Sequence, residues 1–187
     1  KEVDSNGTVT KAASNVTVDV LTIGGSELDA FVGVNGGTSD AMGFGLSDVE
    51  FALALMSEKP TGDNLNPTRG WTALQATAGQ VGFVGIPAID VNATNMSVAI
   101  NQADGDDTVV VDFSQGATDL NVLTGANKTM HLNLDGSEGE LVQATGHLNI
   151  NVASFFQVSG DFGIKSATTK VTLADKEVDA QGNVTKA

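Results

Sequence analysis

Residues 148–152 read LNINV, and this short stretch indicates how the chain folds. Leu148, Ile150 and Val152 are apolar, whereas Asn149 and Asn151 between them are polar. Because successive side chains of a β-strand point to opposite faces, such alternation gives a strand one apolar and one polar face. The stretch therefore predicts a half-buried strand.

The same alternation recurs along most of the chain. Gly, Asn and Asp separate the alternating segments, as turns require. The residues that carry the pattern are Val16, Val18 and Val20; Met96, Val98 and Ile100; Val109, Val111 and Phe113; Met130, Leu132 and Leu134; Phe162 and Ile164; and Val171 and Leu173. We therefore expect an all-β module of roughly ten or more strands, built either as an elongated β-sandwich or as a β-solenoid-like stack.

One segment carries both helix and strand signals. Residues 47–50 fit a capping box ahead of FALALMSE, but Val49, Phe51 and Leu53 also alternate with period two. The strand-rich neighbourhood favours a strand. We expect exposed loops at 57–70, which is the longest polar stretch, and at the glycine-rich residues 33–45.

The two ends of the chain repeat each other. Residues 1–12 read KEVDSNGTVTKA and residues 176–187 read KEVDAQGNVTKA, so 9 of 12 positions are identical at a spacing of 175 residues. A fixed period indicates a tandem array. We expect residues 1–175 to form one all-β repeat module and residues 176–187 to begin the next copy.

Charge and composition restrict the classes of partner. The net charge is −14, which disfavours nucleic acid and anionic membranes but attracts cations. No apolar run approaches the roughly 20 residues of a membrane-spanning helix, so we expect no membrane insertion. Cysteine is absent, which removes thiol catalysis and cysteine-ligated metal sites.

Two acidic clusters are candidate Ca²⁺ sites, because calcium takes oxygen ligands from Asp, Glu and backbone carbonyls. The first contains Asp104, Asp106 and Asp107, and the second contains Asp135, Glu138 and Glu140. Neither has the spacing of an EF-hand loop, and a solvated turn is the alternative reading of each.

The sequence gives no sign of catalysis. His131 and His147 are the two histidines, and we expect His131 on the polar face of a strand and His147 at a strand start. The serine-hydrolase elbow and the zinc-protease helix motif are both missing. We therefore expect no enzyme.

Trp71 follows the polar loop and is a candidate sugar-stacking residue, with a partly buried core position as the alternative.

Four segments, LTIGGSELDAFVGVNGG, DVEFALALMS, DGSEGELVQATG and KVTLAD, resemble the long tandem repeats of giant bacterial surface proteins of the adhesin-like, calcium-associated type. The resemblance spans most of the chain and lies in its general texture. It implies export to the cell surface or the extracellular space and a spacer or adhesive role. It implies no catalytic residues.

Three functions follow as expectations. A structural spacer, with neighbouring repeats of the same chain as its partners, predicts module ends at opposite poles. A self-assembling filament module predicts edge strands that pair between copies in a fibre, with the KEVD segments as strands of a shared sheet. A carbohydrate- or partner-binding module would use loop 57–70 and an exposed Trp71.

Overall fold

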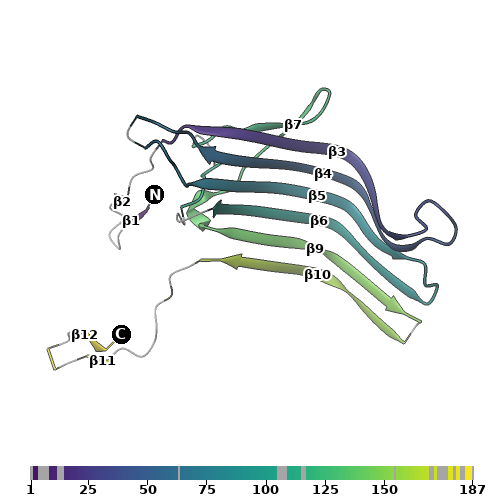
Figure 1. The fold of residues 1–187 in the computed structure, drawn as a ribbon. Coiled ribbons are helices and arrows are strands. Elements are labelled where there is room, and N and C mark those ends of the chain that lie inside the picture. The colour runs from purple at the N-terminus through teal and green to yellow at the C-terminus, as the bar shows by residue number, and fades with distance from the viewer. Residues whose placement is uncertain are drawn as a thin grey trace.

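A computed structural model describes residues 2–3, 9–11, 15–62, 64–104, 109–114, 117–153, 155–168, 171, 177–178, 180–181 and 184–186. Its main feature is a twisted six-stranded antiparallel sheet (Figure 1). In spatial order the strands are β10 (Phe156–Ala167), β9 (Leu141–Val152), β6 (Ile89–Asp104), β5 (Gly70–Val84), β4 (Met42–Glu58) and β3 (Val18–Val34). The prediction of an all-β chain is confirmed.

The sheet is a meander in which each strand pairs with its neighbour along the chain, apart from one insertion between β6 and β9. The insertion contains the hairpin of β7 (Asn121–Gly125) and β8 (Lys128–His131) and the short 3-10 helix η1 (Gly136–Glu138). An antiparallel meander with an even number of strands begins and ends at the same end of the sheet. The chain accordingly enters β3 at Val18 and leaves β10 at Ala167 at one end, on opposite edges (Figure 1).

Two small hairpins at the chain ends share one geometry. β1 (Glu2–Val3) pairs with β2 (Val9–Lys11), and β11 (Glu177–Val178) pairs with β12 (Val184–Lys186). The partners are Glu2 with Lys11 and Val3 with Val9 in the first hairpin, and Glu177 with Lys186 and Val178 with Val184 in the second. Each hairpin has its register shift after the Glu. The repeated sequence thus forms the same structure twice, 175 residues apart.

Alternation in β9 and β10 is uninterrupted, with register pairs that run from Phe156–Val152 to Ala167–Leu141. Their even-numbered residues therefore share one face, which includes Leu148, Ile150 and Ile164. We call the face of the sheet that contains these residues the apolar face.

In β6 the apolar residues change from odd to even numbers at the middle of the strand. Ala93 lies opposite Leu148 and Val98 lies opposite Ala144, so both belong to the apolar face. Asn95 lies between them, with a φ of 52°, where the register shifts between Thr94 and Ser97. This bulge adds one residue and so keeps both halves of β6 apolar on the same side, whereas a slip without it would turn one half over.

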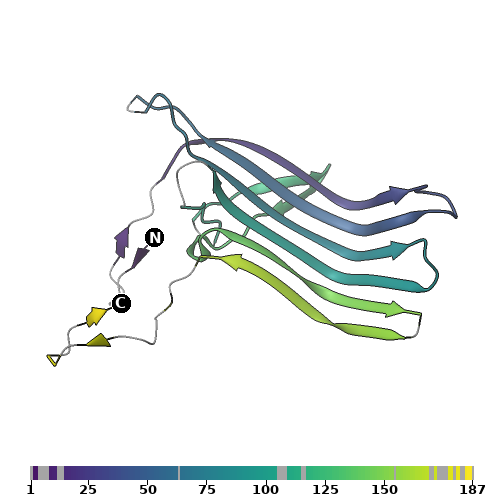
Figure 2. The ribbon, with the colours of Figure 1, turned by 60° about the horizontal axis from the view of Figure 1, so that its bottom comes forward.

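Similar irregularities occur beside the Asn95 bulge in the neighbouring strands of the sheet. Glu27 of β3 and Asp48 of β4 have φ values of 55° and 53°, and β3 has register shifts between Gly25 and Ala30. In β5 Gly79 lies beside Asp48, where a Cβ on the glycine would be only 3.1 Å from the Asp48 Cβ. The bulges form a row across the sheet, which is bent as well as twisted along its length (Figure 2).

Part of the opposite face is covered by residues 109–114 and 117–134, which we call the lid. Four lid side chains, Phe113, Val122, Leu132 and Leu134, are buried against five sheet residues, Ala52, Ala54, Met56, Trp71 and Ala73. β7 lies against β3, where Ser26 Oγ donates to the Thr124 carbonyl at 3.1 Å. The hydrophobic core is therefore a small sandwich between the sheet and its own insertion.

An ion pair joins the lid hairpin to the bulge in β3. The Lys128 ammonium lies 2.6 Å from the Glu27 carboxylate. The hydrogen bond from Lys128 and its positive charge hold the pKa of Glu27 below its ordinary value. Both side chains face solvent, so this pair orients the hairpin without adding much stability.

The sequence-based expectations for individual segments had mixed outcomes. The strand at 47–58 is confirmed, because these residues lie within β4. The loop expected at 33–45 was too long, since β3 extends to Val34 and β4 begins at Met42. Residues 109–113 alternate but are not a strand, because they cross the sheet as part of the lid with Phe113 buried. Among the described residues there is no helix long and apolar enough to cross a membrane.

Candidate functional site

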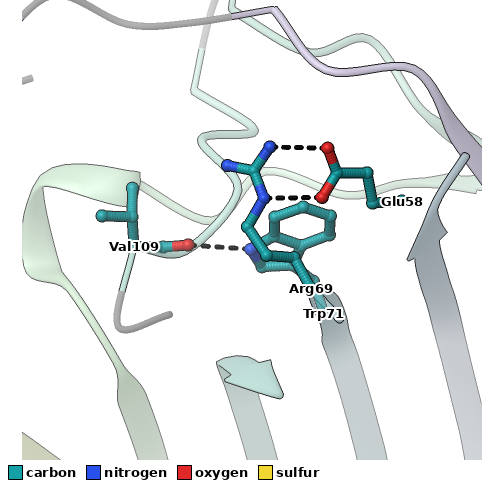
Figure 3. A network of polar contacts seen from close by, with 4 residues as sticks. All are labelled: Glu58, Arg69, Trp71 and Val109. Atoms are coloured by element: carbon teal, nitrogen blue, oxygen red, sulfur yellow. Dashed lines mark hydrogen bonds and ion pairs between the residues drawn. The ribbon is translucent and has the colours of Figure 1, made fainter. Parts of the chain in front are cut away.

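The polar loop between β4 and β5 is anchored by an ion pair at its two ends. Glu58 closes β4 and Arg69 precedes β5, and their backbones are joined by a 3.0 Å hydrogen bond from Glu58 N to the Arg69 carbonyl. The Arg69 guanidinium donates from Nε and Nη2 to the two Glu58 carboxylate oxygens, at 2.7 and 2.8 Å (Figure 3). Glu58 is only 10% exposed, so this bidentate pair is well shielded from water.

Trp71 lies directly beneath this ion pair. The Arg69 Cζ is 5.7 Å from the centroid of the indole ring, which is a cation–π arrangement (Figure 3). The indole Nε1 donates a 2.8 Å hydrogen bond to the carbonyl oxygen of Val109, at the start of the lid. Trp71 therefore connects three parts of the fold: the sheet, the 59–69 loop and the lid.

A shallow open depression of about 410 Å³ lies beside this cluster. Its wall includes Glu58, Arg69, Trp71 and Asp104. The polar groups in it bind one another, since the Thr72 hydroxyl also donates to Asp104 Oδ2 at 3.1 Å. The arrangement holds the strand ends together: Glu58 and Arg69 neutralise each other, and Asp104 accepts a hydrogen bond from Thr72.

The structure does not present Trp71 as a stacking platform. Its side chain is 5% exposed and belongs to the hydrophobic core. The alternative reading of the sequence, a core position, describes it correctly. Arg69 and Trp71 are two residues apart at a strand start, so both lie on one side of the strand, and that spacing was the signal that sequence reasoning missed.

The first acidic cluster is described only at Asp104, the last residue of β6. Asp106 and Asp107 lie outside the described residues. The calcium site proposed for these three residues stays a prediction.

The residues of the second acidic cluster are engaged separately. Asp135 caps η1 by accepting a 2.8 Å hydrogen bond from Ser137 N, and Glu138 forms an ion pair with Lys165 of β10. Glu140 precedes β9. Within the described part of the chain, no group of three or more His, Cys, Asp or Glu side chains is arranged to hold a metal ion.

The sequence predicted His147 at a strand start, but it lies in the middle of β9. There it forms a polar cluster with residues of β10. Its Nδ1 is 2.8 Å from Asp161 Oδ1 and its Nε2 is 3.1 Å from Ser159 Oγ. This is the hydrogen-bond order of a serine-hydrolase triad. However, the Asp161 side chain is 92% exposed, and the cluster lies on an open strand face outside the depression described above. A triad works through a shielded carboxylate and oxyanion donors, so we read the cluster as a cross-strand contact.

His131 ends β8 and faces Asp119, with 3.3 Å between Nδ1 and Oδ1. Its side chain is about half exposed, as the polar face of a strand predicts. The contacts of His131 with other described residues give no indication of a catalytic role.

Comparison with known proteins gives no match: no family model fits the chain, and no curated protein or solved structure is similar to it.

Proposed function

We propose that the chain is a non-catalytic structural unit, one elongated module of ten or more strands, in a tandem array within a large secreted or cell-surface protein of the bacterial adhesin type. Two hairpins with identical pairing, 175 residues apart, are the observation that carries the proposal. The acidic surface and the absence of cysteine fit an extended, self-repelling extracellular chain.

The fold changes how such an array would be built. A simple spacer predicts ends at opposite poles, but the sheet is entered at Val18 and left at Ala167 at the same end. Successive modules would therefore lie side by side rather than end to end. The array would grow across the strands, with about 25 residues of linker, including one terminal hairpin, between β10 of one module and β3 of the next.

Edge pairing between modules is a second form of the same function. β3 and β10 are the two outer strands of the six-stranded sheet. β10 runs toward the end where the following β3 would start, so the two strands would be antiparallel and would continue the meander. Within the chain, Glu2–Val3 and Glu177–Val178 of the two KEVD segments pair with β2 and β12 in two-stranded sheets.

A two-module protein, residues 1–175 followed by residues 1–187, tests the array. If modules are independent units, its thermal midpoint equals that of the single chain and its maximum dimension in small-angle scattering grows by about one sheet width. If β10 pairs with the next β3, the midpoint rises, because the outer strands gain partners. A two-module protein whose second module stays unfolded contradicts both forms of the proposal.

A further inference from the structure

The apolar face of the sheet has no cover in the described structure. The lid lies on the other face, where Gly24 of β3 contacts it so closely that a Cβ would be 2.5 Å from the Leu123 carbonyl oxygen. On the apolar face, large side chains are left in solvent: Val32 is 69% exposed and Ile164 is 66% exposed. Leu21, Ile23, Phe44 and Val158 also have a large exposed fraction.

Register pairs show that this face is continuous across all six strands. One row contains Ile23, Leu53, Leu74, Ile100 and Val142. A second row, on the other side of the bulges, contains Val32, Phe44, Phe83, Val91, Ile150 and Val158. Within this row the Phe44 and Phe83 rings meet edge to face, with 5.1 Å between centroids.

The row of bulges keeps apolar residues on this face along the whole length of the sheet. Without them, the apolar residues beyond Asp48 in β4 and beyond Asn95 in β6 would turn to the opposite side. Non-glycine residues with positive φ are costly, so four strands retain a strained residue or a glycine at this level for a face that the described chain leaves in water. A solvent-exposed face would not need this alignment, whereas a buried face does.

The absence of charged side chains from this face indicates what kind of partner it can bind. No Asp, Glu, Lys or Arg lies in the rows between Ile23 and Val34 of this face, although the chain has 23 acidic and 9 basic residues. A basic or acidic partner would find no complementary charge on it. A surface that is uncharged and apolar offers a second copy of itself a matching apolar surface, and two sheets with the same twist pack face to face at a small angle.

The size of the face also suffices. Six strands about 4.8 Å apart and about 12 residues long cover an area of roughly 1,000 Å². A stable specific interface needs about 800 Å² from each partner. Exposed apolar patches of more than a few hundred Å² mark interaction surfaces on monomeric proteins.

We propose that two copies of this chain associate through their apolar faces to form a two-fold symmetric β-sandwich. Each copy contributes its six-stranded sheet, and the two lids lie on the outside. The inference concerns the isolated chain and does not depend on the tandem array. It also gives the elongated sandwich expected from the sequence a physical form, in which the second sheet comes from a second copy.

The test is the oligomeric state of the 187-residue chain and of two charge-matched double variants. Ile23→Lys with Val158→Lys places two lysines on the apolar face, in the two outer strands. Thr22→Lys with Gln157→Lys places them on the neighbouring residues, which are exposed on the opposite face. Sedimentation velocity across a concentration series gives the mass, and circular dichroism verifies the sheet.

We expect the unmodified chain and the Thr22/Gln157 variant to sediment at twice the 19.1 kDa monomer mass. The Ile23/Val158 variant should be monomeric, with a dimer Kd raised at least about 100-fold, because buried unpaired charges oppose association. If the lysines unfold the chain, Ile23→Thr with Val158→Thr replaces them and should weaken the dimer while the sheet remains. A monomeric parent chain overturns the proposal. So does a dimer, or any larger assembly, that the apolar-face variants leave intact.

Discussion

The indole nitrogen of Trp71 and the carbonyl oxygen of Val109 are 2.8 Å apart, and this single hydrogen bond joins the second residue of β5 to the first described residue of the lid. The indole is almost fully buried, so the bond is protected from competing water. Trp71 is thus both the largest side chain of the core and a link that fixes where the lid starts.

Replacement of Trp71 separates these two contributions. Trp71→Phe retains most of the apolar contact but loses the bond to Val109 and part of the Arg69 stacking, so we expect about 1–2 kcal/mol less stability. Trp71→Ala also opens a cavity and should cost about 3–5 kcal/mol. Urea unfolding followed by circular dichroism measures both. Equal losses for the two variants would show that the hydrogen bond, and not the packing, dominates.

The Glu58–Arg69 pair should be worth more than a surface ion pair, because it is bidentate and lies against Trp71. A double-mutant cycle with Glu58→Gln and Arg69→Gln should give a coupling free energy of about 1–2 kcal/mol, against less than about 1 kcal/mol for an exposed pair. The Lys59–Asp19 pair, which is 3.0 Å long and well exposed, provides the matched cycle. Indistinguishable coupling energies would remove any special role for the Arg69 cluster.

Close contact at Gly24 gives a third prediction. A Cβ there would meet the Leu123 carbonyl oxygen at 2.5 Å and Val122 Cγ1 at 3.0 Å, so Gly24→Ala should push the lid from β3 and cost about 1–3 kcal/mol. A Cβ on Gly163 of β10, which lies on the other side of the sheet from the apolar face, meets only Thr145 Cγ2 at an ordinary 3.7 Å, and Gly163→Ala should be neutral or slightly stabilising. The difference between the two unfolding midpoints is the measurement, and equal midpoints would mean that the lid yields without cost.

Alternation alone predicted part of every strand of the six-stranded sheet except β5, but not the length or the faces of the strands. At 148–152 and at 162–164 the pattern is regular and the strands are as expected. In β6 the odd-numbered Val91 and the even-numbered Val98 share a face only because Asn95 adopts a left-handed conformation, which sequence periodicity does not specify. Only the register between neighbouring strands shows that the apolar residues before and after each shift lie on the same face.

The lid shows the opposite failure. Val109, Val111 and Phe113 read as a strand, yet the buried residues of this segment are Val110 and Phe113. Their environment is set by long-range contacts: Phe113 N donates to the Leu134 carbonyl at 2.8 Å and Asn101 Nδ2 donates to Val111 at 2.8 Å. Such contacts join residues that are distant in the chain, so no local pattern encodes them. For the same reason, the spacing of Arg69 and Trp71 could be read from the sequence, but their contacts with Glu58 and Val109 could not.

The calcium prediction for Asp104, Asp106 and Asp107 has a direct measurement. A cation that binds only the folded chain adds about 2.7 kcal/mol of stability at a concentration 100 times its Kd. Added Ca²⁺ should therefore raise the thermal midpoint, and a chelator should reverse the rise. Asp106→Asn with Asp107→Asn should abolish the response, whereas Asp135→Asn with Glu138→Gln should retain it. A midpoint that is the same with calcium and with chelator ends the prediction.

Asp112 links the lid to the η1 turn and should make stability depend on pH. Its Oδ1 accepts hydrogen bonds from Ser114 N at 2.9 Å and from Gly136 N at 3.1 Å. Burial raises the pKa of the Asp112 carboxyl, but the hydrogen bonds from Ser114 and Gly136 together lower it by more, so that the pKa lies below its ordinary value of 3.8. The ionised carboxylate is therefore the form that the folded state prefers.

A lowered pKa in the folded state means that the unfolded chain binds the proton more readily. The contribution of Asp112 to stability is then fully present above the ordinary pKa and is lost as the pH falls through the folded value, below 3.8.

Asp112→Ala should cost about 1–3 kcal/mol at pH 7, because two backbone N–H groups lose their acceptor. The stability difference between the parent chain and the variant should shrink as the pH falls below 3.8, since protonation weakens the carboxylate as an acceptor. Urea unfolding at a series of pH values measures this difference, with the exposed Asp29→Asn as the matched control. A difference for Asp112→Ala that stays constant down to the acid transition would show that the charge of Asp112 does not stabilise the lid.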